Sequence, residues 1–255
     1  MTSIFDRPEF NAALFFPRRD RSAPPAGARD LRVNVGGGVH VHVRRHAAPD
    51  ARCTLLLFHG NGEVVADYDD AAARYARCGA ALSIADYRGY GASDGTPTLR
   101  AVIEDARPIA EAVAAEAPGP LVVMGRSLGG AAAHELYARP IATMVGVVLE
   151  STFVDMPALI RRRGLTPPPL TAEEEAVFDP RTKLPLGQLP LLVLHGDRDQ
   201  IIVPTEGAAT LAAAGSADKR LVMIAGRGHN DISFADTYWG ALADFIARLQ
   251  RSVAS

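Results

Sequence analysis

The sequence predicts an α/β protein with a doubly wound, mostly parallel sheet, an N-terminal antiparallel hairpin and a small cap insertion. Near-continuous apolar runs recur along the 255 residues, as is typical of parallel strands that are buried on both faces. Alanine-rich segments that favour helix separate these runs. Before the first run, two stretches of alternating apolar and polar residues flank three consecutive glycines, which predicts a hairpin.

Each element follows from its local pattern. The residues before position 31 are predicted as loops, and the hairpin comprises residues 31–35 and 39–43. Further strands are predicted at residues 54–58, 81–85, 121–124, 145–149, 191–194 and 221–224. Helices are predicted at residues 64–78, 99–117, 128–139, 205–214 and 234–249. This alternation implies crossovers of one hand, with ligands bound beyond the carboxyl ends of the strands.

One segment interrupts the alternation. Residues 153–190 are rich in proline and carry clusters of both charges, which is not the pattern of a regular crossover helix. We expect a small cap at about 153–190, lying over the strand ends. Its basic run, Arg161 to Arg163, is followed by the acidic run Glu173 to Glu175, so we interpret both as a solvated surface of mixed charge.

Length and composition are those of an ordinary globular protein. A chain of 255 residues can bury one sizeable core, so a single domain is expected over residues 1–255. Hydrophobic residues make up 48% and charged residues 22%, far from the disordered and membrane extremes. The formal net charge of −2 argues against a nucleic-acid-binding protein, which would carry a basic excess.

Cysteine usage and the first residues bear on cofactors and location. The two cysteines, Cys53 and Cys78, belong to no C-x-x-C or histidine-ligand pattern, so neither a zinc site nor a disulfide framework is expected. The apolar stretch at residues 12–16 is too short for a signal-peptide core or a membrane span. We therefore expect no membrane span and, by default, a cytoplasmic location.

The sharpest chemical signal is a G-x-S-x-G sequence, Gly125 to Gly129, placed after a predicted strand and opening a predicted helix. A tight strand-to-helix turn presents the hydroxyl of Ser127 but strains its backbone, and the two glycines allow strand and helix to approach closely. Ser127 would also lie at a helix N-terminus, where free N–H groups stabilise an anion. This pattern predicts a nucleophilic serine.

A serine hydroxyl needs a base, which in turn needs a third group to orient it. His229 follows the last predicted strand in a loop bracketed by glycines, and two aspartates, Asp197 and Asp199, follow the preceding strand. Along the chain, the serine comes first, the aspartates second and the histidine last, which is the order expected of a catalytic triad on a sheet of this kind. The other histidines lie in strands, in His-Gly turns or inside a helix, and they are interpreted as structural.

Five segments together resemble the α/β-hydrolase superfamily: Phe58-His-Gly-Asn-Gly62, Asp86-Tyr-Arg-Gly-Tyr-Gly-Ala-Ser93, Gly125-Arg-Ser-Leu-Gly129, His195-Gly-Asp-Arg-Asp199 and Gly228-His229. The match spans about residue 31 to the C-terminus. The His-Gly-Asn turn, the Asp-Tyr-Arg-Gly-Tyr-Gly segment and the short cap are similar to small-cap serine hydrolases, which include protein depalmitoylases and monoacylglycerol-lipase-like enzymes.

The resemblance assigns further roles. It implies that Asp199 is the catalytic acid and that Asp197 is a turn residue. It implies an oxyanion hole formed by the backbone N–H groups of Leu128 and Asn61, and it implies no metal or cofactor. The expected reaction is hydrolysis of an ester or thioester of a small molecule or acyl chain, through an acyl-enzyme on Ser127.

Two groups of alternatives stay open. One is a peptidase or amidase of the same fold. The other is a noncatalytic module, either a binding module or a dinucleotide-binding protein, although no G-x-G-x-x-G follows a predicted strand. An acyl substrate is compatible with the apolar residues of the predicted cap, which are Phe153, Met156, Leu159, Ile160 and Leu165.

Overall fold

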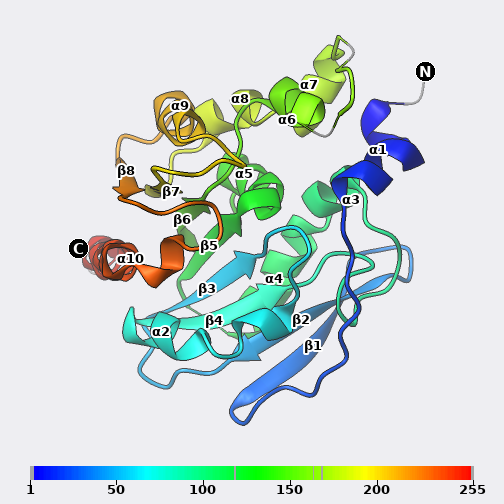
Figure 1. Cartoon of the computed structure of the whole chain (residues 1–255). Coiled ribbons are helices and arrows are strands. Elements are labelled where there is room, and N and C mark those ends of the chain that lie inside the picture. Colours follow the sequence, from blue (N-terminus) through cyan, green and yellow to red (C-terminus); the bar gives the residue numbers. More distant parts are fainter. Residues whose placement is uncertain (1–2, 118, 163, 168, 254–255) are drawn as a thin grey trace.

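A computed structural model describes residues 3–117, 119–162, 164–167 and 169–253 of the chain. Its eight strands form one sheet in the order β1-β2-β4-β3-β5-β6-β7-β8 (Figure 1). The hairpin strands run antiparallel, β1 to β2 and β2 to β4, and all other neighbours are parallel. The strands are β1 (Ala28–Asn34), β2 (His40–His46), β3 (Cys53–Phe58), β4 (Ala80–Ala85), β5 (Leu121–Arg126), β6 (Met144–Glu150), β7 (Leu191–Gly196) and β8 (Lys219–Ile224).

The predicted fold class is confirmed, and every predicted strand coincides with an observed one, although the predicted hairpin strands each extend one residue further into the turn. Side chains alternate between two hydrophobic clusters, one on each face of the sheet. In β3, Leu56 and Phe58 pack in one cluster, whereas Leu55 and Leu57 pack in the other. Burial on both faces explains why these strands read as continuous apolar runs.

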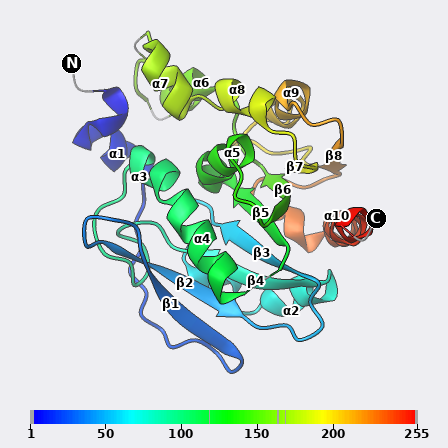
Figure 2. The same cartoon turned by 180° about the vertical axis from the view of Figure 1, so that it is seen from behind.

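Helices cover both faces of the sheet (Figures 1 and 2). One face carries α2 (Ala72–Arg77) and the long α10 (Asp236–Val253), which follows η5 (Ile232–Phe234). The other carries α3 (Leu99–Glu104), α4 (Ala106–Glu116), α5 (Gly130–Ala138) and α9 (Thr205–Ala213). Among the described helices, none combines the length and apolar character that a bilayer span requires.

Two predicted helices are interrupted. The helix predicted at residues 64–78 is divided into two parts, the short 3₁₀ helix η2 (Val65–Tyr68) and the α-helix α2 (Ala72–Arg77). Residues 99–117 form α3 and α4, with the break at Asp105. Pro108 explains this second break, because proline lacks the N–H that would bond the carbonyl of Glu104, and its ring clashes with that carbonyl.

The prediction that the first residues form loops is wrong in part. Residues 4–14 contain η1 (Ile4–Asp6) and α1 (Pro8–Leu14), with Phe5, Phe10 and Leu14 buried. Pro8 stands at the first turn of α1, where its missing N–H removes no helical hydrogen bond. A helix of this length is too short to show a clear apolar period, so its stability comes from the buried aromatic rings.

The segment between β6 and β7 forms a cap of short helices: α6 (Met156–Arg162), α7 (Ala172–Phe178), α8 (Pro180–Lys183) and η4 (Leu184–Leu186). Its first residues are anchored by Glu206 at the start of α9, which accepts the N–H groups of Val154 and Asp155. Glu206 also pairs with Arg162 (3.0 Å). Arg161 is exposed, and Arg163 lies outside the described residues.

Candidate active site

The turn between β5 and α5 holds Ser127 in a left-handed backbone conformation, with φ of 51°. Three residues, Ser127–Gly129, form the short helix η3 before α5 begins. A side chain at Gly129 would overlap the carbonyl of Phe58 on the neighbouring strand, so only glycine allows this close approach. The strained turn expected from G-x-S-x-G is therefore present.

The three residues of the predicted triad meet beyond the carboxyl ends of β5, β7 and β8. His229 Nε2 lies 3.0 Å from the hydroxyl oxygen of Ser127, and His229 Nδ1 lies 2.7 Å from Asp199 Oδ2. The aspartate is 3% exposed and the histidine 8%. This arrangement can pass the hydroxyl proton of Ser127 to a ring nitrogen while the carboxylate holds the other ring nitrogen.

Asp199 sits among donors that favour its charged form. Burial alone would raise its pKa, but hydrogen bonds from His195, His229 and the N–H of Ile202 outweigh that effect and hold the pKa well below its usual value. The neighbouring Asp197 instead accepts the exposed N–H of Gly226 (2.7 Å). The structure thus places Asp199, and not Asp197, against the histidine.

The loop after β3 carries Asn61, whose side chain is hydrogen-bonded to the N-terminal segment and to Tyr90. Asn61 Oδ1 accepts hydrogen bonds from the N–H of Phe16 (3.0 Å) and the hydroxyl of Tyr90 (2.7 Å), and its Nδ2 donates to the carbonyl of Leu14 (2.5 Å). Leu128 follows Ser127 directly in η3. The side chain of Asn61 therefore anchors its loop, which leaves the backbone as the part that can face a substrate.

The buried carboxylate of Asp86 is hydrogen-bonded to residues on both sides of this loop. Asp86 accepts hydrogen bonds from His42 Nδ1 (2.9 Å), His59 Nε2 (3.2 Å) and the N–H of Val65 (3.1 Å). Burial would raise the pKa of Asp86, but the two histidines more than offset this and lower it. His59 is thus held in a buried structural network rather than directed at Ser127.

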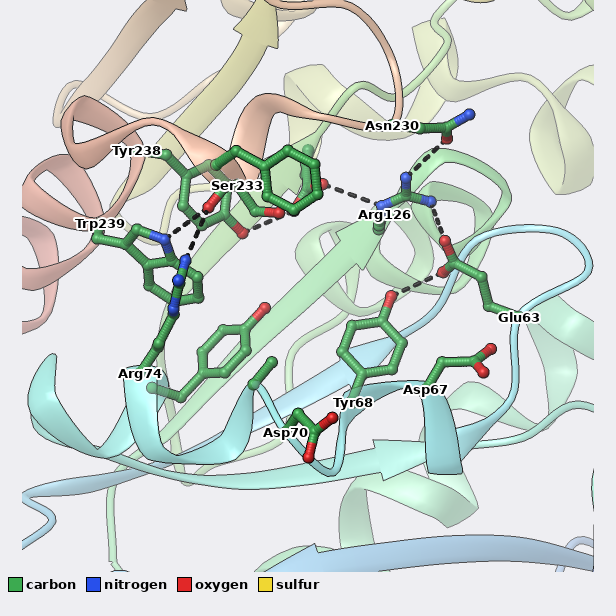
Figure 3. A pocket seen from close by; sticks show the side chains of 14 residues that line it. Glu63, Asp67, Tyr68, Asp70, Arg74, Arg126, Asn230, Ser233, Tyr238 and Trp239 are labelled. Carbon is green, nitrogen blue, oxygen red and sulfur yellow. Dashed lines mark hydrogen bonds and ion pairs between the residues drawn. The ribbon is translucent and has the colours of Figure 1, made fainter.

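Sequence reasoning missed one residue of this region, Arg126, the variable residue before the nucleophile (Figure 3). Its guanidinium pairs with Glu63 (2.5 Å) and Glu150 (3.0 Å) and donates to Asn230 Oδ1 (3.0 Å). Burial would lower its pKa, but the two carboxylates more than offset this and raise it. The sequence offered one signal for this ion pair: Arg126 lies inside the G-x-S-x-G motif, and Glu150 ends the next strand.

Beside Arg126, a cavity of about 350 Å³ opens between α2, η5 and α10 (Figure 3). Carboxylates, aromatic rings and two arginines line it, including Glu63, Asp70, Arg74, Tyr238 and Trp239. In the described part of the chain, no group of three or more histidine, cysteine, aspartate or glutamate side chains is placed to hold a metal ion.

Comparison with known proteins agrees with this architecture. The family described as serine aminopeptidase, S33, matches residues 49–180. Protein bem46 of Schizosaccharomyces pombe is 30% identical over 208 residues, which cover 78% of this chain and 69% of bem46.

Two solved structures share the fold at low sequence identity. The esterase Pf2001 of Pyrococcus furiosus superposes with a TM-score of 0.73 at 15% identity, covering 92% of this chain and 98% of that one. Est1E of Butyrivibrio proteoclasticus, solved with ferulic acid bound, gives 0.70 at 16% identity, covering 87% and 99%. The family match and the likeness to bem46 show that the chain belongs to the α/β-hydrolase superfamily, in the hydrolase family described as serine aminopeptidase, S33.

Proposed function

We propose that the protein is a serine hydrolase that cleaves carboxylic esters or thioesters through an acyl-enzyme on Ser127. The observation that carries the proposal is the hydrogen-bonded chain from Ser127 through His229 to Asp199. A serine hydroxyl in this setting becomes a competent nucleophile at neutral pH, whereas an isolated one does not. The esterase name of Pf2001, a structure with the same fold, is consistent with this chemistry.

The reaction has two halves. In the first, Ser127 Oγ attacks the carbonyl carbon, its proton passes to His229 Nε2, and the leaving alcohol or thiol departs with that proton. In the second, His229 takes a proton from water as the water attacks the acyl carbonyl carbon, and it then returns that proton to Ser127 Oγ as the bond between Oγ and the acyl carbon breaks and the carboxylic acid leaves. In both, Asp199 stabilises the protonated ring. The N–H groups of Leu128 and Asn61 are proposed to hold the oxyanion, and no metal or cofactor takes part.

The family description makes aminopeptidase activity the competing function. An aminopeptidase must bind the free ammonium group of its substrate, which calls for an unpaired carboxylate near the site. The two glutamates that contact the turn before Ser127, Glu63 and Glu150, are both paired with Arg126. Neither of these two glutamates is therefore free to bind an ammonium group.

The test is turnover of p-nitrophenyl esters of increasing acyl length, a thioester panel and amino-acid p-nitroanilides by the wild type and Ser127→Ala. We expect Ser127→Ala to lower ester turnover by at least about 10⁴-fold with its melting temperature unchanged. Ser233→Ala, which alters a serine of the neighbouring cavity, is the matched control and is expected to stay within about twofold, as for a change outside the reacting groups.

Each other outcome points elsewhere. A folded Ser127→Ala variant with full activity would overturn the assignment of the nucleophile. Preference for p-nitroanilides would support the aminopeptidase. A folded wild type that turns over nothing and is not labelled by a fluorophosphonate would support a noncatalytic binding module. The cytoplasmic location stays a prediction, which fractionation of cells that express the full chain would test.

A further inference from the structure

We propose that Arg126 is a positioning residue, which holds the nucleophile turn, the loop of Asn61 and the loop of His229 in one relative geometry. The inference rests on the proposed function, since it concerns the loops of that site. Arg126 directly precedes Ser127, and its side chain is 12% exposed. Its contacts run to carboxylates, an amide and a carbonyl, so it acts through these groups rather than on the substrate.

The first link reaches the loop of Asn61. Arg126 Nη1 pairs with Glu63 Oε1 (2.5 Å), and the other carboxylate oxygen, Glu63 Oε2, accepts the N–H of Gly60 (2.6 Å) and the hydroxyl of Tyr68 (2.7 Å). A side chain at Gly60 would overlap the guanidinium, so the arginine lies directly against this loop. Gly60 immediately precedes Asn61, whose N–H is the proposed oxyanion donor.

The second link reaches the loop of the histidine. Arg126 Nη2 donates to Asn230 Oδ1 (3.0 Å) and to the carbonyl oxygen of His229 itself (3.3 Å). Figure 3 shows the guanidinium between Glu63 on one side and Asn230 on the other. A planar group with several fixed N–H directions suits such bridging, whereas a lysine ammonium is a single point charge.

The third link anchors the arginine to the sheet. Arg126 Nε donates to Glu150 at the end of β6 (3.0 Å), and the second oxygen of Glu150 accepts the hydroxyl of Tyr238 (2.7 Å). Glu150 is 3% exposed, and its burial raises its pKa. Removing Arg126 would leave this buried carboxylate without its cationic partner, which is energetically costly. The ion pair with Glu150 therefore holds the guanidinium of Arg126 in one place at the end of the sheet.

The experiment compares Arg126→Ala and Arg126→Lys with Arg74→Ala as the matched control. Arg74 lines the same cavity but lies over the ring of Trp239 and donates to the carbonyl oxygen of Ser233 in η5 (3.3 Å), so it makes none of the contacts by which Arg126 joins the loops. Displacement of catalytic groups by about 1 Å can cost roughly 100-fold in rate. We therefore expect Arg126→Ala to lower kcat for a p-nitrophenyl ester by about 10- to 100-fold with KM within about threefold. We expect Arg126→Lys to recover part of the loss and Arg74→Ala to stay within about twofold of wild type.

A second measurement needs no catalytic activity. Hydrogen exchange followed by mass spectrometry is expected to show faster exchange in Arg126→Ala in the peptides that contain Gly60 and Asn230, with the rest of the sheet unchanged. Arg126→Lys, which keeps the charge, covers the case in which Arg126→Ala does not fold. If the wild type has no Ser127-dependent turnover, the proposed function fails, while exchange still decides whether Arg126 orders the two loops.

Results that would overturn the inference are distinct. A folded Arg126→Ala variant with wild-type kcat and unchanged exchange in both loops would show that Arg126 positions nothing. A loss confined to KM would assign Arg126 to substrate binding. A uniform increase in exchange over the whole sheet, with kcat lost equally in Arg126→Lys, would show a general structural role instead.

Discussion

At the residue scale, the place of the reactive hydroxyl depends on a backbone conformation that few residues adopt. Ser127 has φ of 51°, a conformation that costs about 1–3 kcal/mol outside glycine and persists only where its surroundings impose it. The close approach of Gly129 to Phe58 is part of that surrounding structure. The strain places the Ser127 hydroxyl within hydrogen-bonding distance of His229.

The two aspartates after β7 give a direct test of which one orients the histidine. Asp199→Asn is expected to lower kcat/KM by roughly 10³- to 10⁴-fold without unfolding the protein, because an amide beside Nδ1 favours the wrong tautomer of His229. Asp197→Asn is the control, since Asp197 contacts the N–H of Gly226. Steady-state ester hydrolysis measures both, and a larger loss in Asp197→Asn would transfer the orienting role to that residue.

At the element scale, the N-terminal helices join the cap to the body of the domain. Phe5 of η1 packs on Phe178 of α7, with ring centroids 4.1 Å apart. The adjacent Asp6 forms two hydrogen bonds with Arg100 of α3 (2.7 and 2.8 Å). Asn11 of α1 accepts the first N–H of α3. Because these contacts involve both α7 and α3, loosening the first residues also loosens the cap.

Phe5→Ala is therefore expected to cost about 3–5 kcal/mol of unfolding free energy, the usual cost of truncating a fully buried phenylalanine. Phe234→Ala is the matched control, because that ring is 69% exposed, and its expected effect is within about 0.5 kcal/mol. Urea denaturation gives both values. Equal effects of the two substitutions would show that the N-terminal helices contribute no more than surface residues.

At the scale of the whole molecule, a buried histidine links stability to pH. His134 of α5 is 1% exposed, and neither ring nitrogen has a hydrogen-bond partner in the part of the chain that the structure describes. Burial, with a smaller contribution from the charge of Lys183, lowers its pKa from 6.5 to about 3. The unfolded chain takes up this proton near pH 6.5 and the folded chain does not, so stability is retained above that pH and falls below it.

The expected contribution of His134 is a loss of up to about 1.4 kcal/mol per pH unit between pH 6 and pH 4. His134→Met, similar in volume and without a titrating group, should make the unfolding free energy fall less steeply over that range. Comparison at pH 8 isolates the packing effect, since the histidine is neutral there in both states. Identical slopes for the two proteins would contradict the assignment.

The parts of the molecule differ in how far the sequence could predict them. The strands were predictable because a strand buried on both faces is apolar along most of its length, as residues 55–58 are. That Ser127, His229 and the aspartates after β7 would lie close together followed from the rule that parallel strands end at one edge of the sheet, whereas the choice of Asp199 over Asp197 came from the resemblance to the α/β-hydrolase superfamily. The break at Asp105 could have been read from Pro108.

Other features depend on contacts that no local pattern encodes. The short helix α1 forms because Phe10 and Leu14 are buried against distant elements, and its own length gives too little periodicity to detect. The ion pairs of Arg126 depend on where Glu63 and Asn230 come to lie after folding. Such long-range polar contacts are decided by tertiary packing.

The hydrogen bonds that assemble the site also say when in folding it can form. The bond from Phe16 to Asn61 joins residues 45 positions apart, that from Ser127 to His229 spans 102, and that from Arg126 to Asn230 spans 104. Closing such long loops is entropically costly until the intervening strands have paired. A nascent chain therefore cannot display the reactive serine beside its base until β8 has joined the sheet, which keeps an active nucleophile out of incompletely folded species.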